Sequence, residues 1–120
     1  MENKMEFLKQ NGMDMDSALS YLGDYETIDE IIRDFYDGLD SQLQQLEDLK
    51  NQKDMANYAI YVHALKSNYR SLGLKEYAED AYQHELQSKA NNIEFVENNF
   101  NTLVNDKERI KRIIEKYKTM

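Results

Sequence analysis

Apolar residues recur every three or four positions along most of this chain, which is the spacing of one face of an α-helix. The longest such stretch runs from about residue 27 to residue 49. Its apolar positions are Ile28, Ile31, Ile32, Phe35, Tyr36, Leu39, Leu43, Leu46 and Leu49. Because adjacent apolar pairs widen the stripe at its start, we expect this helix to face the core of a bundle.

Three further long helices are predicted after this one. Asp54 is a good N-cap and Gly73 is a good residue to end a helix, and apolar residues repeat between them at steps of four and three. The next helix is predicted from about Lys75 to Lys89 and the last from Ile93 to Tyr117, with two asparagines as the break between them. Ahead of the long helices, a short helix is predicted from about Asp16 to Leu22.

The composition agrees with a fold made of helices. The chain has 120 residues, no proline and only four glycines, so its long stretches lack the strongest helix breakers. Short connections between long amphipathic helices make neighbouring helices antiparallel. We therefore predict one domain over residues 1–120, an all-α, antiparallel up-down four-helix bundle with short N-terminal helices packed on one end. Because this fold does not need a dimer, we expect a monomer.

The net charge of the chain limits the classes of partner that it is expected to bind. It carries 23 acidic and 15 basic residues, a net charge of -8, and phosphate backbones and anionic membranes repel such a surface. We therefore expect neither nucleic acid nor membrane as a partner. The chain has no cysteine, which excludes disulfides and thiolate zinc sites. It also has no apolar run long enough for a signal peptide or a membrane span, so a cytoplasmic protein is expected.

His63 has a distinctive position on the second long helix. On a helical wheel the apolar residues of this helix cluster on one side, and His63 lies on the opposite side. Ala59, Lys66, Ser67 and Arg70 lie within about 60° of it on the same wheel. We therefore expect His63 in a polar stripe that faces solvent, together with these neighbours.

The charge around His63 differs from that of the rest of the chain. No acidic residue occurs between Asp54 and Glu76, whereas Lys66 and Arg70 fall inside this window. A neutral imidazole is nucleophilic near pH 7, and a phosphoryl dianion held on it is stabilised by a nearby cation. A lone exposed histidine on a charged helix is more often an ordinary surface residue, so spacing and charge alone leave both interpretations open.

A short motif and its surroundings resemble a known family. Residues 63–67, which read His-Ala-Leu-Lys-Ser, and the Leu72-Gly73 pair after them resemble the signature of histidine-containing phosphotransfer domains. Residues 12–24 resemble the short helix near the start of these domains, and residues 77–95 resemble parts of the two helices that follow the motif. The similarity covers most of the chain, and the moderately specific motif lies in the expected helix of the expected bundle.

The resemblance implies a role for each residue of the motif. His63 would accept the phosphoryl group, and Lys66 would stabilise that group electrostatically. Ser67 stands where the family commonly has glycine, and a small residue there lets the partner approach the imidazole. Arg70 and Ala59 would contact the partner together with Ser67.

Four further residues near the motif need an interpretation. Asn68 and Tyr69 stand where the family usually has small residues, and because Tyr69 falls on the apolar stripe, we expect a change of packing rather than of chemistry. Glu85 lies about as far after the turn as His63 lies before it, which would let it orient the imidazole by accepting a hydrogen bond. We nevertheless favour a solvated Glu85. His84 is expected at the edge of the bundle and not as a ligand.

The resemblance implies a phosphorelay. The neutral imidazole of His63 would attack an aspartyl phosphate on a receiver domain, and the phosphohistidine would pass the group to a second receiver domain. The implied partners are response-regulator receiver domains and a hybrid histidine kinase. We expect no cofactor on this chain, because the receiver domain would bring Mg2+. The sequence has no glycine-rich phosphate loop and no kinase motif, so we expect a phosphoryl carrier that does not phosphorylate itself from ATP.

Three alternatives stay open. A protein-interaction bundle of the same fold would leave the histidine unused. A metal-binding bundle would combine His63 and His84 with carboxylates, but the sequence has no ligand-spacing signature and no metal is expected. The dimerisation domain of a histidine kinase would need an acidic residue directly after the phosphorylated histidine, where this chain has Ala64.

Overall fold

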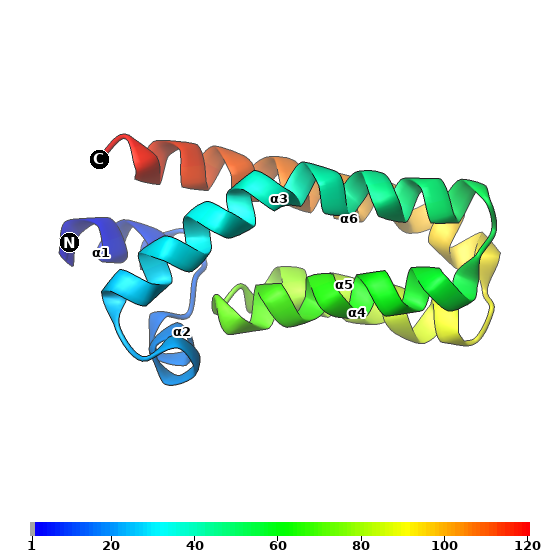
Figure 1. Ribbon diagram of the computed structural model, residues 1–120, viewed down its shortest axis with the longest axis horizontal. Coiled ribbons are helices and arrows are strands. Elements are labelled where there is room, and N and C mark those ends of the chain that lie inside the picture. Colours follow the sequence, from blue (N-terminus) through cyan, green and yellow to red (C-terminus); the bar gives the residue numbers. More distant parts are fainter. Residues whose placement is uncertain (1) are drawn as a thin grey trace.

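The computed structural model describes residues 2–120, and this part of the chain consists of six α-helices and contains no β-strand (Figure 1). The helices are α1 (Glu2–Gln10), α2 (Met15–Leu22), α3 (Tyr25–Asn51), α4 (Met55–Ser71), α5 (Lys75–Lys89) and α6 (Ile93–Lys118). The prediction of an all-α fold is therefore confirmed. The predicted bounds of the long helices differ from the observed ones by about two residues or less.

Polar side chains fix where most of these helices begin. Asp14, Asp24, Asp54 and Asn92 each precede a helix and accept a hydrogen bond from the backbone N–H three residues later. Such caps satisfy backbone donors that a helix start otherwise leaves unpaired. The carboxylate of Asp24 lies 2.8 Å from the backbone nitrogen of Thr27. This cap explains why α3 begins earlier than its apolar stripe predicts.

The four long helices differ in length, and this difference sets the place of the short ones. α4 lies beside α5, and α3 lies alongside α6 (Figure 1). α3 and α6 have 27 and 26 residues and are about 40 Å long, whereas α4 and α5 have 17 and 15 residues and reach only about 25 Å. α3 and α6 therefore extend further at one end. α1 and α2 occupy that end, where α1 contacts α6 and α2 contacts α3 and α4.

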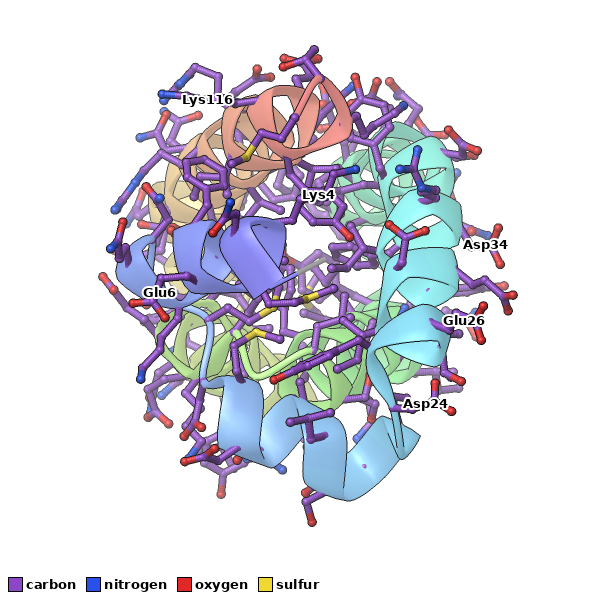
Figure 2. The ribbon with its side chains drawn as sticks, turned by 90° about the vertical axis from the view of Figure 1, so that its left-hand side faces the viewer. Lys4, Glu6, Asp24, Glu26, Asp34 and Lys116 are labelled. Carbon is purple, nitrogen blue, oxygen red and sulfur yellow. The ribbon has the colours of Figure 1, made fainter. Side chains whose placement is uncertain are left out.

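Apolar side chains from all six helices form one core. Figure 2 looks along the long helices from the end that carries α1 and α2, and the charged Glu26 and Asp34 lie on the outside of α3. Tyr58, Tyr69 and Tyr117 are fully buried. No helix of the described part of the chain combines the length and apolar character that a membrane span requires.

The turn between α4 and α5 anchors α2. Gly73 in this turn has a φ angle of 72°, and its carbonyl accepts a hydrogen bond from the backbone N–H of Asp14 at 2.8 Å. A Cβ atom at this position would overlap the backbone of Asp14. An ion pair of 2.7 Å between Lys75 Nζ and the Asp14 carboxylate lies beside this contact. The glycine that the sequence predicts as a helix end thus also allows α2 to approach closely.

Candidate functional site

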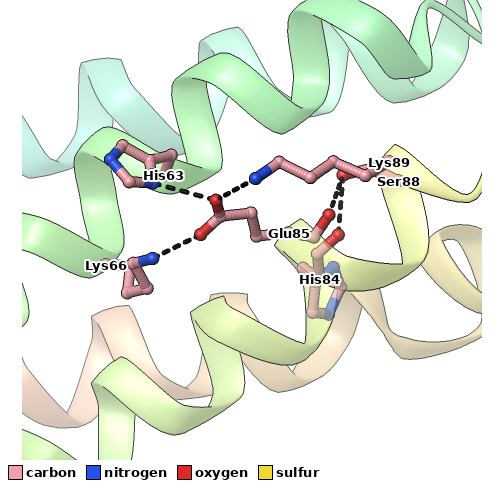
Figure 3. A network of polar contacts seen from close by, with 6 residues as sticks. All are labelled: His63, Lys66, His84, Glu85, Ser88 and Lys89. Carbon is pink, nitrogen blue, oxygen red and sulfur yellow. Dashed lines mark hydrogen bonds and ion pairs between the residues drawn. The ribbon is translucent and has the colours of Figure 1, made fainter.

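His63 projects from the middle of α4, and 56% of its side chain is exposed. Val62 and Leu65 on the same helix are fully buried. Because a helix turns by about 100° per residue, His63 points away from the core, as the wheel predicts. Its Nδ1 atom lies 2.9 Å from Oε2 of Glu85 on α5 (Figure 3).

Glu85 is the centre of a small network of charges (Figure 3). Only 3% of its side chain is exposed. Its Oε1 atom lies 2.6 Å from Nζ of Lys66, and its Oε2 atom lies 2.8 Å from Nζ of Lys89. A buried carboxylate is costly unless its charge is compensated and its oxygens accept hydrogen bonds. The two lysines compensate its charge, and its Oε2 atom accepts hydrogen bonds from Lys89 and His63.

The network keeps Glu85 ionised and sets which nitrogen of the neutral His63 ring carries the proton. Burial by itself would raise the pKa of Glu85, but the hydrogen bonds from Lys66, Lys89 and His63 outweigh it and lower the pKa to about 2. The ionised carboxylate can only accept hydrogen bonds, so the proton of the neutral imidazole lies on Nδ1. Nε2 therefore keeps its lone pair, and Figure 3 shows this nitrogen on the side of the ring that points away from Glu85.

Where α4 faces α5, three residues are more buried than the sequence predicts. The preference for a solvated Glu85 is wrong, because this residue lies between the two helices. Lys66 and Ala59 are each only 6% exposed, whereas the wheel places them in the solvent-facing stripe. Both lie on the same side of His63 on the wheel, and α5 covers this side. The Lys66 ammonium also lies 5.2 Å from the centre of the Tyr82 ring on α5.

The other residues of the motif have the orientations that the sequence predicts. Ser67 and Arg70 are exposed on the face of the histidine. The small Ser67 side chain follows the histidine by one turn. Tyr69 is fully buried in the core, and the Asn68 amide lies 3.5 Å from the Gln42 side chain on α3. Neither Asn68 nor Tyr69 has a hydrogen bond with the imidazole, whose partner is Glu85.

His84 is a core residue and not a residue of the bundle edge, which corrects the prediction. Its Nδ1 atom accepts a hydrogen bond from the Tyr58 hydroxyl at 2.8 Å, and its Nε2–H donates to the Asn99 carbonyl at 3.1 Å. Burial lowers the pKa of His84 to about 4, so the ring is neutral at pH 7. Among residues 2–120, no group of three histidine, cysteine, aspartate or glutamate side chains comes together as a metal site would require.

Two residues near His63 were not predicted from the sequence as part of the site. Lys89 follows Glu85 by four residues, and this spacing on a helix is a recognisable signal for an ion pair. Tyr82 gives no such signal, although its ring lies beside both Lys66 and Arg70, with the Arg70 guanidinium 5.7 Å from the ring centre.

The fold and this site agree with one family. The family model of the Hpt domain matches residues 30–117, which is well over half of the chain, and the chain belongs to this family. Hpt domains act in histidine phosphotransfer within phosphorelays, as phosphoryl carriers without kinase activity, and they interact with receiver domains and kinases. α1 and α2 lie outside the matched residues. No curated protein and no solved structure gives a significant match.

Proposed function

We propose that this chain is a phosphorelay intermediate that accepts a phosphoryl group on His63 from a receiver-domain aspartate and passes it to another receiver domain. One observation carries the proposal: Nδ1 of the exposed His63 donates a hydrogen bond to the ionised Glu85, which leaves the lone pair on Nε2. The four long helices would then be the antiparallel up-down bundle of this family, with α1 and α2 packed on one end.

The geometry supports a direct transfer. The Nε2 lone pair attacks the phosphorus of the aspartyl phosphate, the P–N bond forms, and the P–O bond to the aspartate breaks. The electron pair of that bond leaves with the aspartate carboxylate. The proton stays on Nδ1, and the Glu85 carboxylate stabilises the positive charge that the ring gains. The second transfer reverses these steps with the aspartate of another receiver domain, so neither step needs a base.

The charges around Glu85 favour a phosphoryl dianion. A bare carboxylate next to the imidazole would repel the dianion, but Lys66 and Lys89 lie 2.6 Å and 2.8 Å from its oxygens. Two lysine cations against one carboxylate leave the site with a net positive charge. Lys66 thus supports the phosphoryl group electrostatically from its position beside Glu85. Ser67, Arg70 and Ala59 contact the partner around the histidine.

The proposal includes the setting of the reaction. The partners are response-regulator receiver domains and a hybrid histidine kinase, and the chain acts in the cytoplasm as a monomer. The receiver domain brings Mg2+, and this chain contributes no cofactor and no autokinase activity.

A transfer experiment tests the proposal. Purified receiver domains are phosphorylated with acetyl phosphate and mixed with the wild type or with His63→Gln in the presence of Mg2+. We expect a label that is labile in acid and stable in base on the wild type alone. Because His63 is exposed, the variant keeps its fold, which circular dichroism checks. Label on His63→Gln would place the acceptor at another residue and contradict the role of His63. No label on the folded wild type from a full panel of receivers would favour an interaction module with an unused histidine.

A further inference from the structure

Two rows of side chains meet where α4 packs on α5. The row on α4 consists of His63, Lys66 and Arg70, and the row on α5 consists of Tyr82, Glu85 and Lys89. Within each row the members follow one another at steps of three and four residues, which keeps them on one face of their helix. Glu85 holds the imidazole at one end of the α4 row (Figure 3). Tyr82 has no role in the proposed transfer so far.

The ring of Tyr82 lies against two cations of α4. The centre of this ring is 5.2 Å from the Lys66 ammonium and 5.7 Å from the central carbon of the Arg70 guanidinium. Both distances are within the about 6 Å over which the face of an aromatic ring attracts a cation. Lys66 and Arg70 are four residues apart, so they lie one turn apart on the same face of α4. One ring therefore contacts both cations.

The two cations have few other partners. Lys66 is only 6% exposed, and in the described part of the chain its one ion pair is with Oε1 of Glu85. An ammonium group has three N–H donors, so an aromatic face beside it offsets part of the water that burial removes. Arg70 is exposed, and it forms no ion pair among the described residues. A free arginine side chain samples many rotamers, whereas a guanidinium stacked on a ring samples fewer.

We propose that Tyr82 is a positioning residue, whose ring holds Lys66 and Arg70 in the row that begins at His63 and so keeps two cations ready for the phosphoryl group. The inference rests on the proposed function, because His63 must carry that group. Cations that are already in place lose less side-chain freedom when the dianion arrives, so they stabilise it more. Tyr82 acts through these two side chains and takes no part in the bonds that form and break.

A reaction without a protein partner tests this role. Phosphoramidate transfers its phosphoryl group to an imidazole and releases ammonia, and phosphorus NMR follows the phosphohistidine, with His63→Gln as the blank. Tyr82→Leu removes the aromatic face, and Tyr82→Phe keeps it. We expect Tyr82→Leu to react about three to ten times more slowly than the wild type, and Tyr82→Phe to stay within about twofold of it.

A matched control and a second readout distinguish positioning from a general loss of packing. Tyr25 on α3 is 38% exposed, and no cation of the described chain lies over its ring, so Tyr25→Leu should react like the wild type. NMR relaxation of the Arg70 Nε–H group reports how freely this side chain moves. We expect restricted motion in the wild type and in Tyr82→Phe, and increased motion in Tyr82→Leu, while circular dichroism shows that all variants keep the fold.

The outcomes separate the role of Tyr82 from the proposed function. If Tyr82→Leu reacts at the rate of the wild type, including no reaction of either, the positioning role is wrong. It is also wrong if Tyr82→Phe or Tyr25→Leu is as slow as Tyr82→Leu. Transfer from phosphorylated receiver domains tests the function separately. A wild type that reacts with phosphoramidate but accepts label from no receiver would refute the proposed function, and the Tyr82 variants would still decide whether the ring positions the two cations.

Discussion

At the scale of single residues, Glu85 links the electrostatics of the site to the stability of the fold. Its carboxylate interacts with the imidazole of His63 and with two lysines at once. The two lysines differ in their surroundings, because Lys66 is buried with Glu85 whereas Lys89 is exposed. Loss of the carboxylate charge therefore leaves one ammonium buried without its counter-ion, while the other is hydrated.

We expect Glu85→Gln to lower the free energy of unfolding by about 3 kcal/mol at pH 7, and Lys89→Gln to lower it by less than about 1 kcal/mol. The pKa of Glu85 is about 2 in the fold, below its ordinary value of 4.5. The stabilisation is therefore present above pH 4.5 and is lost as the pH falls toward 2. Urea unfolding of the three proteins between pH 3 and pH 7 measures both effects. Equal stability of Glu85→Gln and the wild type at pH 7 would contradict this account.

At the scale of the helices, the α4–α5 hairpin decides which residues meet at the site. The connection between the two helices is only residues 72–74, so residues about equally far from the turn lie level with one another. This register brings Glu85 beside His63. Gly73 sits in the turn and also touches Asp14 ahead of α2, so the same residue holds the hairpin and the N-terminal end of the molecule together.

We expect Gly73→Ala to destabilise the protein by about 2–4 kcal/mol, because the new methyl group meets both a positive φ angle and the backbone of Asp14. Gly23→Ala is the matched control. Gly23 also has a positive φ angle, but a Cβ atom there would have no neighbour within 4 Å, so we expect a cost of about 1 kcal/mol. Urea denaturation compares the two variants. Similar losses would show that the contact with Asp14 adds nothing to stability.

At the scale of the whole molecule, two buried titratable groups change the stability of the fold in opposite directions as the pH rises. Burial lowers the pKa of His84 to about 4, so its contribution to stability is lost as the pH falls below the ordinary value of 6.5. Asp106 on α6 behaves in the opposite way. Burial, a hydrogen bond with Asp80 on α5 and the charge of that residue raise the pKa of Asp106 well above its usual range. The folded state thus holds a proton that the unfolded state releases, and stability falls as the pH rises above about 4.

We expect Asp106→Asn to raise the free energy of unfolding by about 1–3 kcal/mol at pH 8, because the neutral amide removes the cost of a buried acid and can still donate to Asp80. The gain should shrink toward pH 4. Asp37→Asn removes the same charge from an exposed position on α3 and should change stability by less than about 0.5 kcal/mol. Thermal unfolding from pH 4 to pH 8 measures the difference, and a variant less stable than the wild type at pH 8 would refute the assignment.

The sequence by itself determined the helices and the exposed position of His63. Periodic apolar residues, capping residues such as Asp54 and the glycine at position 73 set the ends of the long helices, because these signals act within a few residues of the chain. The wheel of α4 placed His63 outside the core for the same local reason. Most of what was predicted of the fold therefore followed from short-range rules.

Only the tertiary structure decided the surroundings of that residue. A wheel describes one helix and does not show which flank the next helix covers, so Lys66 and Ala59 were placed in solvent although α5 buries them. The burial of Glu85 against His63 depends on the pairing of two helices. The sequence thus places His63 on the surface, whereas the packing of α4 on α5 determines the hydrogen bond to its ring and the charges around it.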